Sequence, residues 1–340
     1  MVSVPKNASN ARIAQEIGDY NPVLVLKFLD EKRPGHRHTL TSLAQIAELE
    51  QEAFLKGKAN NRKRYSHNPH QVKVETLQAS KIKNDCRQIF IEAMDQEFGG
   101  KDLTQPLRIL TLPGTQFKTE EALLNHPRLG SKIGEILAVE GIPEVISQVE
   151  QKASEMQSSF PNTRITVIAD QDTELTTTWR AELNPEAGLN AIWLDNMASW
   201  NTGNQDALTQ LLKHPWMFER AWKEGSSALL FITLRAQQER ENAKKILVDY
   251  QNSCPQVQAG SSLTHPTNQR HQWRLQGLTS FLFQEGKKNG LLCLPRTQYI
   301  YRHPQGKGSV MLLCGFEISP LNHTWDQPIR VEVERLQPQQ

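Results

Sequence analysis

The central part of the chain alternates short apolar runs with helical or polar connections, and this alternation constrains the fold more than any other feature. Each run has about the length of a buried strand, and one of them, LRILTLPG, ends in a Pro-Gly turn. Strands that alternate with helices in this way predict a parallel sheet covered on both faces. The predicted strands lie within residues 107–114, 132–141, 164–172, 189–196 and 227–235.

The end of the chain has a different pattern. Residues 291–302 and 309–319 are two apolar runs separated by the turn-rich sequence HPQGKG, which predicts an antiparallel hairpin. The segment before them, residues 253–270, is rich in Ser, Pro and Gln and is predicted to be a long surface loop. The sheet is therefore expected to be mostly parallel and to end in a β-hairpin.

The N-terminal hundred residues have helical spacing of apolar residues. Residues 40–57 and 81–98 both show this spacing, and the second segment stops at Gly99 and Gly100. A polar, basic segment separates the two and is predicted to be a loop or an exposed arm. We expect a helical, basic extension at 1–84, an α/β domain at 85–325 and a C-terminal tail at 326–340.

Composition describes an ordinary globular protein without metal or membrane features. The chain has 340 residues, 38% of them hydrophobic, and its four cysteines are scattered without metal-ligand spacing. No run approaches a membrane span, and the N-terminus lacks the apolar core of a signal peptide, which favours a cytoplasmic protein. A nucleophile elbow and a dinucleotide fingerprint are both missing, which counts against a hydrolase of that type and a dehydrogenase.

Charge is distributed unevenly along the chain, although its formal total is only +2. Residues 51–90 hold nine Lys and Arg against three Asp and Glu, whereas residues 119–200 hold five against thirteen. Residues 260–307 hold seven against one. An acidic middle between two basic stretches is compatible with a polyanionic partner.

Five parallel strands followed by a hairpin give an element order that resembles the class I S-adenosylmethionine-dependent methyltransferases. The resemblance covers roughly residues 85–320 and implies an α/β, Rossmann-like, doubly wound sheet with the last strand inserted antiparallel. It implies S-adenosylmethionine as cofactor. Where the family carries a glycine-rich loop after the first strand, this chain has Leu112, Pro113 and Gly114 and keeps a single glycine.

Acidic residues follow the second and third predicted strands. Glu140 ends the second strand, where the resemblance implies a carboxylate that accepts hydrogen bonds from both ribose hydroxyls of the cofactor. The alternative is a solvated carboxylate that caps the next helix. Asp170 and Asp172 follow the third strand, where the resemblance implies a contact to the adenine amine, with Asp170 the better placed. The alternative is an Asx turn that ends the strand.

The fourth predicted strand is followed by Asp195, Asn196 and, slightly later, Trp200. The resemblance implies that this loop faces the methyl group and its acceptor. Asp195 can accept a hydrogen bond from an acceptor amine, and Trp200 can stack on a flipped or single-stranded base. Alternatively, Asp195 caps the following helix and Trp200 packs in the core.

The two basic stretches are candidate walls of a groove for a phosphate backbone. The alternative is that they are solvated faces with no partner. The candidate nucleic-acid-binding residues are Lys56, Lys58, Arg62, Lys63, Arg64, Arg270, Arg274 and Arg302.

The leading functional hypothesis is methyl transfer from S-adenosylmethionine to a nucleic acid base, DNA or RNA. The alternative is a catalytically inactive protein of the same fold that acts as a scaffold for nucleic acid or protein. The sequence predicts no membrane association and gives no prediction of oligomeric state.

Overall fold

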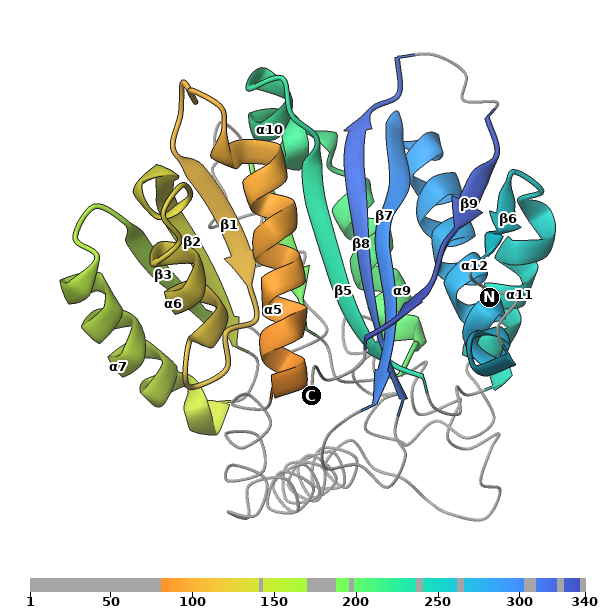
Figure 1. Cartoon of the computed structure of the whole chain (residues 1–340), viewed down its shortest axis with the longest axis horizontal. Coiled ribbons are helices and arrows are strands. Elements are labelled where there is room, and N and C mark those ends of the chain that lie inside the picture. The colour runs from red at the N-terminus through yellow and green to blue at the C-terminus, as the bar shows by residue number, and fades with distance from the viewer. Residues whose placement is uncertain are drawn as a thin grey trace, which may run out of the picture. The chain divides into compact units, whose positions relative to one another are not determined.

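The computed structural model describes a mixed sheet flanked by helices, within the unit formed by residues 74–340 (Figure 1). The structure describes residues 81–140, 143–169, 188–195, 199–236, 241–261, 266–302, 310–322 and 327–336.

The main sheet has eight strands in the order β10-β7-β8-β5-β4-β1-β2-β3. A smaller sheet pairs β6 with β9. The strands are β1 (Leu107–Thr111), β2 (Ile133–Glu140), β3 (Arg164–Ala169), β4 (Ala191–Leu194), β5 (Ala228–Arg235), β6 (Val257–Ala259), β7 (Leu291–Arg302), β8 (Val310–Pro320), β9 (Ile329–Val331) and β10 (Glu334–Arg335).

Strand direction confirms the predicted sheet. The five strands β1 to β5 run parallel, and β8 lies between β5 and β7 and is antiparallel to both. This is the order that the methyltransferase resemblance implies, with the last strand of the hairpin inserted antiparallel. The fold is therefore α/β, Rossmann-like and mostly parallel, as the sequence predicts.

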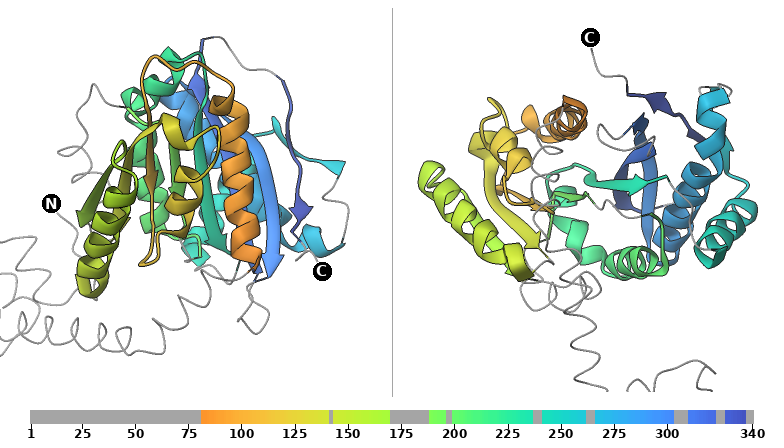
Figure 2. Two further views of the ribbon diagram at one scale, coloured as in Figure 1. Left: turned by 60° about the vertical axis from the view of Figure 1, so that its left-hand side comes forward. Right: turned by 90° about the horizontal axis from the view of Figure 1, so that it is seen from below.

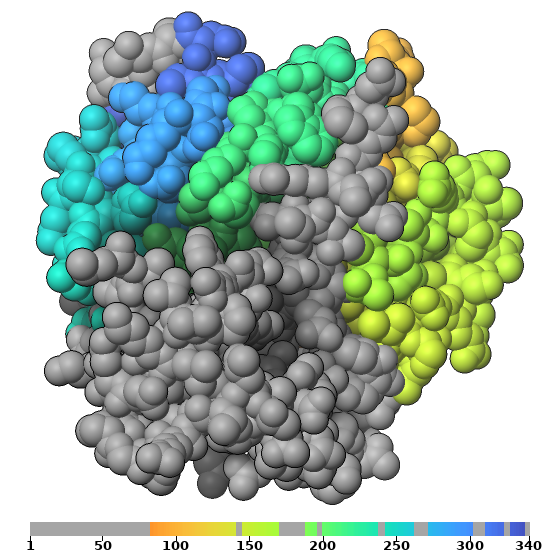
Figure 3. All heavy atoms as spheres, turned by 180° about the vertical axis from the view of Figure 1, so that it is seen from behind, coloured from red at the N-terminus to blue at the C-terminus, as the bar shows by residue number. Residues whose placement is uncertain are grey.

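Helices cover both faces of the sheet, which makes it doubly wound. Figure 2 shows α5 and α6 on one side of the sheet and α9 on the other, and α9 packs against α12. Seen from behind, α11 and α12 lie side by side at one edge, and α7 lies at the opposite edge (Figure 3). None of the helices in the described ranges has the length and apolar character needed to cross a membrane. The longer helices are α5 (Lys81–Met94), α6 (Lys118–Leu124), α7 (Pro143–Ser159), α9 (Thr202–Leu212), α10 (Glu219–Lys223), α11 (Glu241–Ser253) and α12 (Pro266–Lys288).

The central strands form the core because both of their faces are covered. β1, β4 and β5 consist almost entirely of buried residues, as expected for strands between two helical layers. Helix α5 adds to this core from the N-terminal side, since its apolar residues recur at helical spacing and Phe90 is fully buried. The predicted helix at 81–98 is thus confirmed. The expected boundary between residues 84 and 85 falls inside α5.

Two segments differ from the sequence prediction. The predicted loop at 253–270 contains strand β6 and the first turn of α12, so that prediction is wrong in these parts. β6 pairs in parallel with β9, which lies within the segment 326–340 expected to be a tail. Each short strand is stabilised by a partner distant in sequence, and local composition does not reveal such a partner.

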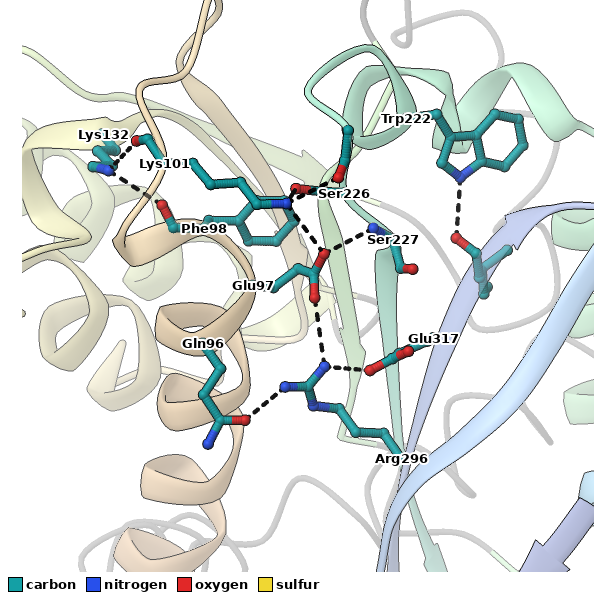
Figure 4. A network of polar contacts seen from close by, with 12 residues as sticks. Gln96, Glu97, Phe98, Lys101, Lys132, Trp222, Ser226, Ser227, Arg296 and Glu317 are labelled. Carbon is teal, nitrogen blue, oxygen red and sulfur yellow. Dashed lines mark hydrogen bonds and ion pairs between the residues drawn. The ribbon is translucent and has the colours of Figure 1, made fainter.

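A polar network attaches the C-terminal end of α5 to β7, to β8 and to the residue that precedes β5 (Figure 4). α5 continues into a π-helical turn, Asp95–Gly99, whose Glu97 accepts a hydrogen bond from the backbone N–H of Ser227 at 2.9 Å. Arg296 on β7 lies 3.6 Å from the same carboxylate and also bonds Glu317 on β8. The network joins three elements at the end of the sheet opposite the carboxyl ends of the parallel strands.

Candidate active site

The sheet reverses its winding direction between β1 and β4. From β1 the chain proceeds to β2 and β3 on one side, and from β4 it proceeds to β5 on the other. In open α/β sheets, ligands bind beyond the carboxyl ends of the strands at such a switch point. Thr111 ends β1 and Asp195 directly follows β4, so both residues mark the candidate site.

Asp195 is held by a lysine from the first turn of α5. The Lys83 ammonium donates to both carboxylate oxygens of Asp195, at 2.7 and 2.9 Å. The Lys83 side chain is 4% exposed and that of Asp195 is 27% exposed. The amine is therefore buried behind the carboxylate, and the carboxylate keeps an accessible side.

Two uncharged side chains lie beside this ion pair. Cys86 on α5 and Tyr301 on β7 are both buried. Burial raises the pKa of the Cys86 thiol to about 12 and raises the pKa of the Tyr301 hydroxyl well above its usual value. Both groups are protonated at neutral pH, so Cys86 is not an active nucleophile in this structure.

Glu120 and Arg87 lie next to the ion pair of Lys83 and Asp195. Glu120, in the first turn of α6, is fully buried, and within the described ranges neither of its carboxylate oxygens has a hydrogen-bond partner. Burial raises the pKa of Glu120, whereas the nearby Thr111 hydroxyl and Arg87 guanidinium lower it. Asp195 also raises it, which places all four groups in one electrostatic environment.

The loop after β1 has an unusual backbone. Gly114 has a φ of 59°, in the left-handed region where only glycine is free of strain. Phe117, which precedes α6, also has a positive φ of 50° and is fully buried. Left-handed non-glycine residues are uncommon and gather at ligand-binding loops. Leu112 packs against the core and Pro113 is buried, so the loop lies close against the sheet.

Unpartnered polar atoms gather around this loop. The hydroxyls of Thr111 and Thr115 are buried and, like the Glu120 carboxylate, have no hydrogen-bond partner in the described part of the chain. Buried polar groups of native proteins almost always have partners. A group of such atoms at the switch point is therefore a feature that a bound ligand would explain.

The predicted cofactor carboxylates are only partly described. Glu140 ends β2 two residues after Ala138, which pairs with Thr111, and its side chain is half-buried. It therefore stands beside the β1 loop, as expected, and its ribose role stays a prediction. Asp170 and Asp172 lie outside the described residues, as does Asn196.

Trp200 lies inside the protein. Its ring is 3% exposed and packs edge-on against Phe281 of α12, with ring centroids 5.3 Å apart. A ring in this position offers no open face for a base to stack on. The placement agrees with the packing alternative.

Of the predicted nucleic-acid-binding residues, only Arg274 has a described side chain. It lies over the ring of Trp273 at 4.3 Å and 3.2 Å from His271 Nδ1. The backbones of Arg270 and Arg302 lie on α12 and β7, but their side chains are outside the described set. Lys56, Lys58, Arg62, Lys63 and Arg64 also lie outside the described residues.

A small cavity brings Trp200 and Arg274 together beside the end of β5. The sequence analysis did not single out Arg235, whose Nε is buried and has no hydrogen-bond partner among the described residues. Leucines make up most of the lining, so the cavity is not a polar site. It is lined by Trp200, Leu234, Arg235, Leu247, Arg274, Leu278 and Leu312.

Lys83, Arg87 and Glu120 are not among the site residues predicted from the sequence. Lys83 and Arg87 are four residues apart and lie on one face of α5, so helical spacing alone would have grouped them. Their partners are far along the chain, with Asp195 lying 112 residues from Lys83. Among the residues with described positions, no group of His, Cys, Asp and Glu is arranged to hold a metal ion.

Comparison with known proteins gives distant structural similarity only. The sequence matches no protein-family profile and none of the curated proteins. Among solved structures, the plantazolicin methyltransferase BpumL, in complex with SAH, is 10% identical, with 74% of this chain and 91% of that chain covered and a TM-score of 0.38. Trm5b from Pyrococcus abyssi is 9% identical, with 70% and 49% covered and a TM-score of 0.36.

TYW2 from P. horikoshii, in complex with MeSAdo, is 8% identical, with 64% of this chain and 59% of that chain covered and a TM-score of 0.33. The chain thus spans about half of Trm5b and under two thirds of this TYW2. Similarity at this level identifies no substrate. The strand order described above is what defines the fold of this chain.

Proposed function

We propose that this chain transfers a methyl group from S-adenosylmethionine to an amino group of a nucleic acid base. The observation that carries the proposal is the Asp195 carboxylate at the switch point, held from behind by Lys83 and exposed on its other side. A carboxylate in this place accepts a hydrogen bond from an acceptor amine and orients its lone pair toward the methyl donor.

The residues around the β1 loop fit such a cofactor. The unpartnered hydroxyls of Thr111 and Thr115 and the carboxylate of Glu120 supply donors and acceptors to a polar ligand. Glu140 ends β2 beside this loop and is suited to hold the ribose hydroxyls, because a carboxylate accepts two hydrogen bonds without a competing donor. The left-handed turn at Gly114 lets the backbone approach a ligand closely.

S-adenosylmethionine held by Glu140 and the β1 loop would supply the methyl group: the acceptor nitrogen would bond to the methyl carbon, the carbon–sulfur bond would break, and its electron pair would stay on sulfur. The nitrogen becomes positively charged and then loses one proton. Asp195 accepts a hydrogen bond from this nitrogen and then the departing proton, which passes on to water. Cys86 takes no part, because its thiol stays protonated.

A further observation supports a nucleic acid as acceptor. The chain has basic stretches on both sides of its acidic middle, and the second of them contributes Arg274 beside the end of β5.

Calorimetric titration with S-adenosylmethionine and S-adenosylhomocysteine tests the cofactor site. We expect saturable binding that E140A weakens by roughly 10- to 100-fold, the cost of losing charged hydrogen bonds of about 1.5–3 kcal/mol. E150A is the matched control, since Glu150 is exposed on α7. An absence of heat at millimolar cofactor would contradict the proposal.

The scaffold alternative rests on the β1 loop, which keeps one glycine and has Pro113 and Phe117 buried within it. The same titration separates the two functions. A scaffold binds an oligonucleotide or protein partner without binding cofactor, whereas the proposed enzyme binds both.

A further inference from the structure

The arrangement of Lys83 and Asp195 sets the charge that an acceptor group meets. The ammonium donates to both carboxylate oxygens at 2.7 and 2.9 Å, so the pair is neutral as a unit. Each carboxylate oxygen has two lone pairs, and one on each remains available on the exposed side. Asp195 therefore still accepts a hydrogen bond, but it carries no unpaired negative charge.

Among the described residues, the groups that surround the pair are close to electrically balanced. Cys86 and Tyr301 are protonated, and Arg87, whose guanidinium donates to Asn84, lies on the same face of α5 as Lys83. Asp85 on α5 is a further carboxylate near Cys86, and burial favours the neutral form of Glu120. Among the described groups, a cationic amine at Asp195 would thus find no net negative charge, and it would lose hydration without compensation.

We infer that Lys83 selects an uncharged amino group as the methyl acceptor, and that it does so by neutralising and positioning Asp195. This inference rests on the proposed function. The exocyclic amines of nucleobases are uncharged at neutral pH, whereas lysine side chains are cationic. Lys83 is a positioning residue, because it is buried behind Asp195 and acts on the acceptor through it.

The test measures transfer of a tritiated methyl group from S-adenosylmethionine to three probes. These are single-stranded DNA and RNA oligonucleotides of mixed sequence and a basic peptide with free lysine amines. The full-length wild type, K83M and K83R are compared, with K223M as control because Lys223 is 61% exposed on α10. S-adenosylhomocysteine affinity is measured calorimetrically for each variant.

We expect the wild type to methylate an oligonucleotide and not the peptide. K83M should lower kcat by roughly 100-fold, since a misplaced catalytic group costs about that factor, with KM and cofactor affinity within about twofold of wild type. K83R should recover most of this loss because it restores the charge and two donors. A merely structural lysine would lower stability and cofactor affinity together with kcat. If K83M does not fold, K83Q replaces it.

Methylation of the peptide at a comparable rate, or a K83M protein as fast as wild type, would overturn the inference and leave the cofactor site intact. Cofactor binding without transfer to any probe would overturn the acceptor assignment altogether. A failure to bind S-adenosylhomocysteine would overturn the proposed function itself, and the calorimetric measurement distinguishes this outcome from the others.

Discussion

Phe90 packs its ring against that of Trp193, with the ring centroids 5.0 Å apart and the planes tilted by 47°. Phe90 lies on α5, on the same helix as Lys83, and Trp193 lies on β4 two residues before Asp195. This aromatic contact therefore packs the helix that carries Lys83 against the strand that precedes Asp195. A second ring, Phe231 on β5, meets Phe90 edge-on at 5.1 Å.

Replacing Phe90 with alanine should destabilise the protein and disturb the site together. The ring is fully buried, so F90A is expected to lower the free energy of unfolding by about 3–5 kcal/mol. Urea denaturation followed by circular dichroism measures this change. Q88A, an exposed position on the same helix, is the control and should change stability by less than about 0.5 kcal/mol. Equal effects of the two variants would contradict the packing argument.

Glu120 should make stability depend on pH in the direction opposite to an ordinary paired carboxylate. Burial raises its pKa in the folded protein, so the folded state binds the proton more tightly than the unfolded chain does. Its contribution to stability is therefore complete below about pH 4.5 and is lost as pH rises through the folded-state pKa.

The variant E120Q removes this titration. We expect E120Q to raise the melting temperature relative to wild type at pH 8, with the difference shrinking toward pH 4. Each unit by which the pKa is raised corresponds to about 1.4 kcal/mol. E121Q is the matched control on the same turn, because Glu121 is about half exposed. A constant difference across the pH range would show that the charge of Glu120 is not responsible.

The strands of this fold are easier to predict from sequence than its site. The central parallel strands are buried on both faces, so each is a continuous apolar run that stands out between polar connections. Helix α12 was missed because its first half, PTNQRHQWRLQG, is mostly polar, and its apolar residues become dense only from Leu275 onward. The hairpin strands β7 and β8 were found because both are long and rich in β-branched, aromatic and leucine residues.

Part of the candidate site follows from the sequence, and the roles of its residues stay predictions. Asp195 and Glu140 were identified because they follow strands, and the carboxyl ends of parallel strands meet at one edge. Lys83 is not predicted, because a local sequence pattern does not indicate which residue of an amphipathic helix contacts a residue 112 positions away. Trp200 was identified by its residue type, and its burial against Phe281 depends on α12, which the sequence had not revealed.

The cysteines should be unreactive in the folded protein. All four are buried, and burial raises the pKa of Cys86, Cys293 and Cys314 to about 12 in each case. At pH 8 only about one in ten thousand of such thiols is ionised. We expect Ellman's reagent to label no thiol within minutes under native conditions and all four in guanidinium chloride. Rapid native labelling that C86S abolishes would contradict the placement of Cys86.

Removing the indole of Trp200 should leave nucleic-acid affinity unchanged. A base-stacking aromatic residue contributes about 1–3 kcal/mol per base, which corresponds to roughly 5- to 150-fold in affinity. Because the ring is 3% exposed, we expect W200F to bind a single-stranded oligonucleotide within about twofold of wild type. Phenylalanine keeps much of the packing against Phe281. A tenfold loss of affinity with unchanged melting temperature would restore the stacking role.

Arg296 should contribute to stability more than a surface arginine does. Its side chain is 15% exposed and contacts Glu317, Glu97 and Gln96 (Figure 4). The guanidinium therefore holds two carboxylates near each other. R296M leaves both carboxylates without this partner, and their repulsion joins the lost hydrogen bonds. We expect a loss of about 1–3 kcal/mol in the free energy of unfolding.

The control for R296M is R164M, which removes an arginine 76% exposed at the edge strand and 3.6 Å from Glu135. An exposed pair of this kind contributes about 0–1 kcal/mol and is screened by salt. Adding E317Q to R296M should recover part of the loss, because it removes one of the two charges that Arg296 neutralises. Additive losses in the double variant would mean that Arg296 and Glu317 act independently, against the geometry of the network.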